Sequence, residues 1–441
     1  MSERDTICAL ASGQPPAAIC ILRLSGDKVW QIAGALLECG LPEPRHATLT
    51  RFRDEDGNLI DEGLVVFMPG PHSYTGEDTL ELYLHGGPAV IKHSLDTLVR
   101  MPGVRLAEPG EFTRRAFEAG KLDLTEAEGV ADIIEAETEA QKAQALRQLT
   151  GGLTETYDRW RTELTGVLAL IEVMVDFPDE GDTPDDTLRP ILGKLDLLID
   201  ELKEALGDRG IGEKIRDGFR VAIVGPPNAG KSSLLNRIAR RDAAIVTDIA
   251  GTTRDVVEVR LVLGGQVVWL ADTAGLRETS DVVEAEGVRR AERAAREADM
   301  RVHVIDGDRP EPPKGPIEPQ DIVVFNKADH RPAALAPDGA LPVSAETGEG
   351  VDKLESWIAS FVSQRAASVE APVITRARHR EKLSAGLASL AAARQLLDDD
   401  IGAELAAEDV RMALRQLGAV IGVVGVEDVL GAVFSQFCIG K

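Results

Sequence analysis

The sequence predicts a multidomain protein of the α/β plus α class, and three observations support this prediction. Before about residue 120, short apolar runs alternate with turn signals, as in a mixed α/β domain. Residues 121–210 and the chain after Pro372 are helical in pattern. Residues 219–365 alternate short apolar strands with helices, the rhythm of a parallel sheet. Because this α/β unit lies between two helical blocks, we expect an insertion into one discontinuous helical domain; two separate helical domains are the alternative.

The elements follow from local patterns in chain order. Apolar runs predict strands in the N-terminal part at 18–22, 64–68 and 80–84. An Ala/Glu/Gln-rich stretch predicts one long helix over 126–149, ended by Gly151 and Gly152. Further helices are predicted at about 153–176, 187–206, 374–399, 405–417 and 427–435. Strands of the inserted unit are predicted at 219–224, 267–270, 301–305 and 322–325. The predicted domains are 1–120, 121–213, 214–371 and 372–441.

Composition excludes several classes of protein. The 441 residues include 49 Lys and Arg against 74 Asp and Glu, a net charge of −25, which argues against non-specific binding of nucleic acid. A local basic groove, or nucleic acid delivered with a partner, stays open. The four cysteines form no CxxC pair and the seven histidines no HExxH motif, so a zinc site is not expected. No leader pattern or membrane-spanning apolar run is present, which predicts a cytoplasmic protein with no membrane contact.

A phosphate-binding loop occupies residues 225–232, which fit GxxxxGK[ST] between a short apolar strand and a helix. Glycines let backbone N–H groups approach phosphates, and the helix N-terminus adds positive potential. Lys231 would neutralise β/γ-phosphate oxygens as a catalytic group, and Ser232 would ligate Mg²⁺. The nucleotide-binding residues predicted here are Asn228, Ala229, Gly230, Lys231, Ser232 and Ser233.

Two later motifs make the site specific for GTP and GDP. Asp272, Thr273, Ala274 and Gly275 follow the second apolar strand; catalytic Asp272 suits an outer-shell Mg²⁺ contact, and the Gly275 N–H suits the γ-phosphate. Asn326, Lys327 and Asp329 follow the fourth strand. A carboxylate there can accept both N–H donors of guanine, which adenine does not offer. Ser344 and Ala345 would supply a backbone N–H for the guanine oxygen.

The segment between the first two motifs predicts a switch. Thr253 in Gly251–Asp255 would reach Mg²⁺ when GTP is bound. Leu276 stands where Ras-like GTPases carry the glutamine that orients water, so hydrolysis needs another group. Glu278, Glu284 and Glu286 are candidates.

A G domain inserted in helices, the Gly251–Asp255 motif GTTRD and the C-terminal Phe437–Lys441 resemble the MnmE (TrmE) family of tRNA-modification GTPases. The N-terminal motifs at 71–78, 107–113 and 120–125 agree with this resemblance. It implies an N-terminal dimerisation domain that binds a formyl or methylene tetrahydrofolate derivative, a discontinuous helical domain and an inserted Ras-like G domain. It also implies work with an FAD-dependent MnmG-like subunit, in a heterotetramer built on a homodimer. The substrate would be tRNA, whose wobble uridine receives an aminomethyl or carboxymethylaminomethyl group on carbon 5.

The resemblance also implies residue roles. In the family, K⁺ replaces an arginine finger across paired G domains; its matching ligands here are Asn228, Thr247, Ile249 and Thr252, with Thr247 and Thr252 also at the nucleotide. Glu284 matches the glutamate that orients the attacking water. Arg23, Glu81, Lys121 and Lys441 match folate contacts, while ordinary surface pairing is the alternative for them.

Some assignments stay open. Cys438 is a redox group, a nucleophile or a structural residue of the tail. Arg376, Arg378, His379 and Arg380 face a partner or tRNA, or form a solvated helix start. The G domain alone does not separate tRNA modification from a ribosome-assembly or regulatory GTPase, because a fold does not carry its function. A folate-binding protein with a vestigial G domain is disfavoured, because the nucleotide motifs are intact.

Overall fold

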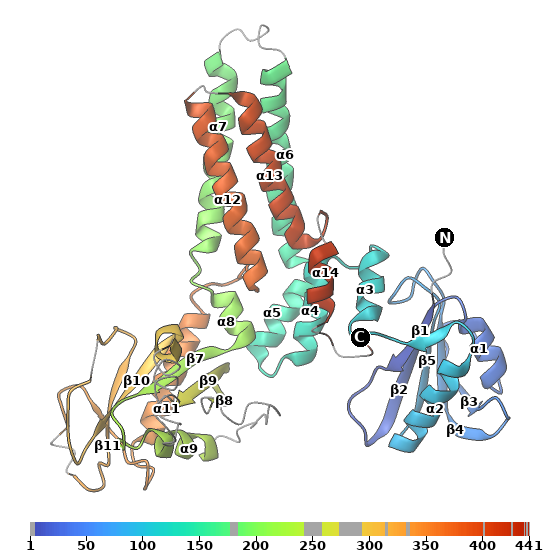
Figure 1. The fold of residues 1–441 in the computed structure, drawn as a ribbon, viewed down its shortest axis with the longest axis horizontal. Coiled ribbons are helices and arrows are strands. Elements are labelled where there is room, and N and C mark those ends of the chain that lie inside the picture. Colours follow the sequence, from blue (N-terminus) through green and yellow to red (C-terminus); the bar gives the residue numbers. More distant parts are fainter. Residues whose placement is uncertain are drawn as a thin grey trace, which may run out of the picture. The chain divides into compact units, whose positions relative to one another are not determined.

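The computed structural model describes residues 5–176, 184–241, 258–272, 293–313, 316–331, 336–399, 402–424, 427–435, 437 and 440. The chain forms two compact units (Figure 1). The first unit comprises residues 1–131, 147–195 and 388–441, and the second comprises 132–146 and 196–387. Helices α4 (Leu124–Glu135), α5 (Glu139–Leu149), α7 (Pro184–Leu206) and α12 (Ala377–Asp398) have residues in both units.

The first unit contains a six-stranded mixed sheet of order β3-β4-β5-β2-β1-β6. Its strands are β1 (Thr6–Leu10), β2 (Ala17–Ser25), β3 (Thr48–Arg53), β4 (Leu59–Met68), β5 (Thr79–Gly86) and β6 (Val104–Leu106). The other elements are α1 (Val29–Leu36), α2 (Pro88–Arg100), α3 (Glu111–Glu118), α6 (Gly152–Asp176), α13 (Ala403–Ile421) and α14 (Glu427–Phe434). The predicted strands at 18–22, 64–68 and 80–84 lie within β2, β4 and β5 and are confirmed.

The two faces of this sheet have different partners because side chains alternate along each strand. On β1, Cys8 packs in one core cluster with residues of α1 and α2. Ile7 and Ala9, on the other face, pack with Phe112 of α3. On these strands, residues next to members of the cluster that contains Cys8 therefore face the α3 side of the sheet.

The second unit contains a six-stranded sheet of order β12-β11-β10-β7-β9-β8, parallel except for the β8–β9 hairpin. Its strands are β7 (Phe219–Val224), β8 (Glu258–Leu263), β9 (Gln266–Asp272), β10 (Met300–Asp306), β11 (Ile322–Asn326) and β12 (Leu341–Pro342). Its helices are α8 (Ile211–Asp217), α9 (Lys231–Arg241) and α11 (Val351–Ala366). Apolar residues of α9 and α11 complete the core with those of the sheet. The four predicted strands are confirmed, whereas β8 was not predicted.

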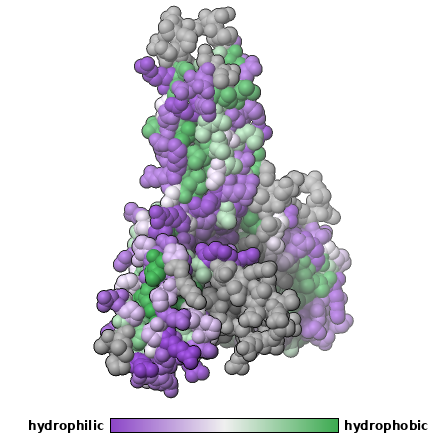
Figure 2. Space-filling view, turned by 60° about the vertical axis from the view of Figure 1, so that its left-hand side comes forward, coloured by the Kyte–Doolittle hydropathy of each residue, from purple (hydrophilic) through white to green (hydrophobic). Residues whose placement is uncertain are grey.

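The two helical blocks pack together, which confirms the discontinuous helical domain. Within the first unit, α6 from the first block packs along α13 from the second, and Arg411 pairs with Glu172 at 2.9 Å. The inserted G-domain sequence lies between these blocks in the chain. Hydrophilic and hydrophobic residues intermingle along the long helices on the face shown in Figure 2. Among the described helices, none has the length and hydropathy needed to cross a membrane.

The single helix predicted over 126–149 is wrong, because the structure divides it into α4 and α5. Thr138 and Gln141 form a reciprocal capping box: the Gln141 N–H donates to Thr138 Oγ1 at 3.2 Å, and the Thr138 N–H donates to Gln141 Oε1 at 3.2 Å. This arrangement starts a new helix at Glu139. The good helix-forming composition around it concealed the break.

Candidate functional site

The nucleotide motifs meet at one edge of the parallel sheet. The loop 225–230 follows β7, Asp272 ends β9 and Asn326 ends β11. These strands run parallel, with β9 and β10 on either side of β7 and β11 beyond β10. The carboxyl ends of such strands form the usual ligand edge of an open α/β sheet. The sequence prediction of a common site is consistent with this arrangement.

The phosphate loop wraps around the amine of Lys231. Its Nζ donates to the carbonyl oxygens of Gly225 at 2.9 Å and Pro226 at 2.8 Å. Burial lowers the pKa of Lys231, and the nearby charge of Asp272 opposes that shift. The ammonium therefore lies beside the backbone that would surround phosphates, at the N-terminus of α9.

Gly230 cannot be replaced by a larger residue in this loop. It has a φ of +88°, and a Cβ at this position would lie 2.3 Å from Asn326 Nδ2. That amide donates to the Ala229 carbonyl at 2.7 Å, and the Ala345 N–H donates to Asn326 Oδ1 at 3.1 Å. Asn326 thus joins the phosphate loop to the Ser344–Ala345 loop. Because Ala345 donates its N–H inside the protein, a guanine oxygen would compete with Asn326 for it.

Ser232 and Asp272 fit a magnesium site. The Ser232 hydroxyl donates to Asp272 Oδ2, although Ser232 lies on α9 and Asp272 ends β9. Mg²⁺ prefers hydroxyl, carboxylate and water oxygens, and these two residues bring such atoms to the phosphate loop. When bound, Mg²⁺ would neutralise charge on the β- and γ-phosphates.

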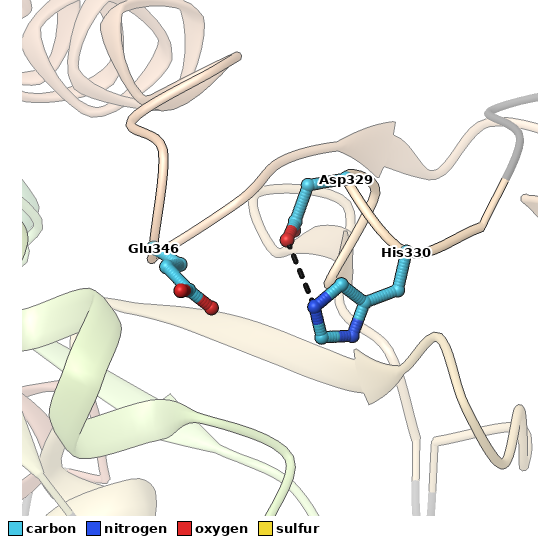
Figure 3. A group of neighbouring side chains, drawn as sticks. All are labelled: Asp329, His330 and Glu346. Carbon is cyan, nitrogen blue, oxygen red and sulfur yellow. Dashed lines mark ion pairs between the residues drawn. The ribbon is translucent and has the colours of Figure 1, made fainter.

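The predicted guanine carboxylate, Asp329, lies in a polar cluster (Figure 3). His330 Nε2 pairs with it at 3.2 Å, and the ligand atoms of Asp329, His330 and Glu346 lie within 4.8 Å of one another. A hydrogen bond from Ser344, with a smaller effect of His330, lowers the pKa of Asp329. The carboxyl is therefore ionised at neutral pH, as an acceptor of guanine N–H groups must be. Sequence reasoning did not identify His330 or Glu346.

Lys327 has acidic partners that the sequence prediction missed. Its Nζ pairs with Asp306 at 2.8 Å and Asp308 at 3.2 Å, and the hydrogen bond that Lys327 donates to Asp306 raises the pKa of Lys327. Asp306 ends β10, so its position after a buried strand was a signal that could have found it.

Several predicted residues lie outside the described part of the chain. They are Thr247, Ile249, Thr252, Thr253, Thr273, Ala274, Gly275, Glu284, Cys438 and Lys441. Asn228 is described: it is exposed, with a φ of +63°. Ser233 is exposed on α9.

A second group of predicted residues lies on the N-terminal sheet, on its α3 side. Arg23 of β2 stands directly opposite Glu81 of β5, and Arg23 Nε pairs with Glu81 Oε1 at 2.8 Å. The Tyr83 hydroxyl donates to the other carboxylate oxygen at 2.7 Å, which, together with burial, raises the pKa of Tyr83 to about 12. The carboxylate is therefore oriented from two directions.

Aromatic rings surround Arg23. Its Cζ lies 5.5 Å from the ring centroid of Tyr74 and 5.8 Å from that of Phe112. The Tyr74 hydroxyl hydrogen-bonds Thr113 at 2.9 Å. Lys121 donates to the Pro71 carbonyl at 2.6 Å, and no described contact joins it to Arg23 or Glu81. Tyr83 was missed because its position depends on strand register, and Tyr74 and Phe112 were missed because a loop and α3 bring them to Arg23 from distant parts of the chain.

The C-terminal tail reaches the same sheet within the first unit. Gly440 has a φ of +99°, and a Cβ there would lie 2.0 Å from the Leu10 carbonyl oxygen. Phe437 packs in a cluster with Phe434 and Leu124. Gly440 therefore lies against β1, the neighbour of the strand that carries Arg23.

A buried ion network supports this region. Arg115 pairs with Glu77 at 2.8 Å and Glu111 at 3.0 Å, and Glu111 also pairs with Arg105 at 2.6 Å. Although burial opposes ionisation, hydrogen bonds from Arg105, the Glu108 amide and Arg115 lower the pKa of Glu111 to about 2. Glu111 of the motif at 107–113 thus has a structural role.

Three residues of the basic segment, Arg376, His379 and Arg380, contact or are buried by their own chain, which corrects the prediction of a solvated helix start for them. Arg376 pairs with Asp132 at 2.6 Å, and Arg380 pairs with Asp208 and Glu213, both at 2.6 Å. His379 is buried. Arg376, directly before α12, is thereby joined to α4, and Arg380 of α12 is joined to α8 through Glu213.

Fold and site together define a class of protein: a multidomain P-loop GTPase with guanine-recognition motifs. A family model described as the MnmE helical domain matches residues 124–438, and one described as the GTP-binding protein TrmE N-terminus matches residues 6–121. The tRNA modification GTPase MnmE of Hyphomonas neptunium is 77% identical over 441 residues, 100% of each chain. That of Parvibaculum lavamentivorans is 51% identical over 99% of this chain and 100% of its own. The chain belongs to the tRNA modification GTPase MnmE family.

Among solved structures, Aquifex aeolicus Era bound to GDP and AlF₄⁻ is 28% identical over 32% of this chain and 56% of its own. The TM-score is 0.24.

Proposed function

We propose that this chain hydrolyses GTP within a complex that adds an aminomethyl or carboxymethylaminomethyl group to carbon 5 of the tRNA wobble uridine. Membership of the family supports the tRNA role. The observation that carries the GTPase role is the convergence of Lys231, Asp272 and Asn326 at one sheet edge. The complex would include a second copy of this chain and an FAD-dependent MnmG-like subunit, and would act in the cytoplasm.

The nucleotide chemistry follows from the described residues. Lys231 would leave its carbonyl partners for phosphate oxygens, because an ionic contact is stronger than a neutral one. Ser232 and Asp272 would hold Mg²⁺ directly and through water. Asp329 would accept the two guanine N–H donors, with the negative charge of Glu346 close by. We further propose that Thr253 completes the Mg²⁺ site and Glu284 orients the attacking water.

Potassium is proposed as the activating ion, with Asn228, Thr247, Ile249 and Thr252 as its ligands. The exposed Asn228 side chain on the phosphate loop is compatible with this role. GTP hydrolysis is expected to be faster in KCl than in NaCl at equal ionic strength. Equal rates in the two salts would contradict the proposal.

A one-carbon tetrahydrofolate derivative is proposed to bind on the α3 side of the N-terminal sheet. Glu81 offers a carboxylate for the paired N–H donors of a pterin, and Tyr74 and Phe112 offer ring faces. Arg23, Lys121 and Lys441 would serve the acidic tail. The tail of the chain, packed at Leu10, supports a place for Lys441 and Cys438 near this site.

The deciding experiment is nucleoside mass spectrometry of tRNA from cells that lack this gene, with and without its restoration. The modified wobble uridines should vanish on deletion and return with the wild-type gene but not with Asp329→Asn. Unchanged tRNA with altered ribosomal subunit profiles would support an assembly GTPase instead.

A further inference from the structure

The β8–β9 hairpin connects two parts of the predicted nucleotide switch. Residues 242–257, which carry Thr253, directly precede β8, and Asp272 ends β9 immediately before Thr273. The strands pair from Glu258 opposite Ala271 to Leu263 opposite Gln266. The paired strands β8 and β9 therefore connect the end of the segment 242–257 to the start of the segment that begins at Thr273.

One cross-strand pair of this hairpin contacts residues outside the G domain but inside the same compact unit. Arg260 stands directly opposite Trp269, with its Cζ 5.5 Å from the indole centroid. Arg260 Nη1 forms an ion pair with Glu137, whose side chain is 28% exposed against 18% for Arg260. Trp269 Nε1 donates to the Asp217 carbonyl at 2.8 Å.

The segments that carry Glu137 and Asp217, the contacts of Arg260 and Trp269, are themselves connected by hydrogen bonds and an ion pair. Glu137 directly precedes the Thr138–Gln141 capping box, and Gln141 Nε2 donates to the Arg216 carbonyl at 2.8 Å. Arg216 also pairs with Asp132 of α4 at 2.9 Å. The α4–α5 junction and the end of α8 are thereby bound together.

The indole also packs directly on the backbone that joins α8 to β7. A Cβ at Gly218 would lie 2.8 Å from Trp269 Cδ1, so only glycine leaves room for the ring. Any displacement of β9 along its axis would therefore reach Gly218 as well as Asp217.

The Arg260 guanidinium has one buried nitrogen without a described partner and an open space beside it. Its Nε is buried and has no hydrogen-bond partner among the described residues. Beside it lies a cavity of about 70 Å³, lined in part by Gln144, Arg216 and Asp217. A cavity of this size can hold several water molecules and leaves the guanidinium room to move. The Arg260–Glu137 ion pair keeps part of its surface in water, so solvent screens it and a switch transition could make or break it.

We propose that Arg260 and Trp269 couple the nucleotide site to the α4–α5 junction and the α8–β7 link. They are positioning residues: they touch neither nucleotide nor Mg²⁺ but transmit the state of the hairpin to Glu137 and Asp217. A ligand changes a distant element only through contacts that differ between two states, and in the proposed coupling the contacts of Arg260 and Trp269 have that role. The inference rests on the GTP-binding part of the proposed function and not on the tRNA chemistry.

The test uses the full chain with Trp269 as its single tryptophan, through Trp30→Phe, Trp160→Phe and Trp357→Phe. The fluorescence emission of Trp269 is measured with GDP bound and with a non-hydrolysable GTP analogue bound. The ratio of the affinities for these two nucleotides is measured as well. Arg260→Glu and Glu137→Arg are each expected to reduce the emission difference at least twofold and to shift the affinity ratio about 2–5-fold. The double charge reversal is expected to restore both.

Lys142→Glu is the matched control, because Lys142 lies on α5 and, within the part of the chain that the structure describes, forms its ion pair with the exposed Glu139 at 2.6 Å. It should behave as the parent protein. If Arg260→Glu fails to fold, Arg260→Lys replaces it, since a lysine keeps the charge and loses the planar stacking. The proposal would be overturned if the emission of Trp269 were the same with both nucleotides. It would also be overturned if the double variant restored neither the emission difference nor the affinity ratio. Failure of the tRNA experiment with an intact nucleotide response would reject only the tRNA role.

Discussion

The two sheets of this chain hold their sites in different ways. The parallel sheet presents its candidate residues at the ends of strands, in loops that each begin directly after a buried run. The mixed N-terminal sheet presents Arg23 and Glu81 on a strand face, in register across β2 and β5. A site at strand ends is assembled from local motifs, whereas a site on a face depends on pairing between distant segments. Substitutions should therefore affect the chemical step in the parallel sheet and the preorganisation of the binding site in the mixed N-terminal sheet.

The largest effect is expected from Asp329→Asn. Two hydrogen bonds from guanine to a charged acceptor are worth about 1.5–3 kcal/mol each, so GTP affinity should fall by about 10²–10⁴-fold. Competition with a fluorescent guanine nucleotide measures this loss. Xanthosine triphosphate should bind the variant better than the wild type, because the asparagine amide can donate to the oxygen that replaces the guanine amine. Unchanged GTP affinity would show that the base binds elsewhere.

Lys231→Ala should reduce the rate of the chemical step by about 10²–10³-fold, the usual cost of removing one preorganised charge from a developing negative centre. Single-turnover phosphate release measures it. Lys353→Ala on the exposed side of α11 is the control and should retain the full rate. Equal rates for Lys231→Ala and Lys353→Ala would show that Lys231 does not contribute to the chemical step.

Glu111→Gln tests preorganisation in the mixed sheet. The folded pKa of Glu111 is about 2 against an ordinary 4.5, so its ionisation contributes about 3 kcal/mol of stability above pH 4.5. This contribution is lost as the pH falls from 4.5 towards 2. The variant should be less stable at pH 7 and should depend less on pH in that window.

Denaturant unfolding followed by Trp30 emission, with the other tryptophans replaced, measures this effect in the N-terminal part. Glu118→Gln, on the same helix and paired with Arg114 at 2.9 Å, is the control. Its effect should be much smaller, because the Arg114 side chain is 47% exposed. Equal losses of unfolding free energy in the two variants would show that the Glu111 ion network stabilises the protein no more than the exposed Glu118–Arg114 pair.

The smallest effect is expected from Tyr83→Phe. Loss of one hydrogen bond to Glu81, worth about 1 kcal/mol, should weaken the binding of 5-formyltetrahydrofolate by about 3–10-fold. Calorimetric titration of the full chain measures it, with Arg51→Ala on β3 as the control. A variant that binds as tightly as the wild type would show that Glu81 does not need this orientation.

Sequence patterns predicted four strands of the G domain, β7, β9, β10 and β11, and the residues of the nucleotide motifs, but not β8 or β12. The structure brings Lys231, Asp272 and Asn326 to one edge, as expected for strand ends in a parallel sheet. The prediction of a single helix over 126–149 was wrong because one capping box outweighs the composition around it. The roles of Thr253, Glu284 and the potassium ligands remain predictions.

By itself the sequence determined what short segments can establish: strand ends, a phosphate loop, helix periodicity and the order of domains. These features depend on residues within a few positions of one another, whose spacing survives in the linear chain. Only the tertiary structure decided which distant charges meet. Arg376 pairs with Asp132, Arg260 with Glu137, and Arg23 with Glu81. Each pair joins segments far apart in the chain, and packing and strand register bring them together where no local pattern records the contact.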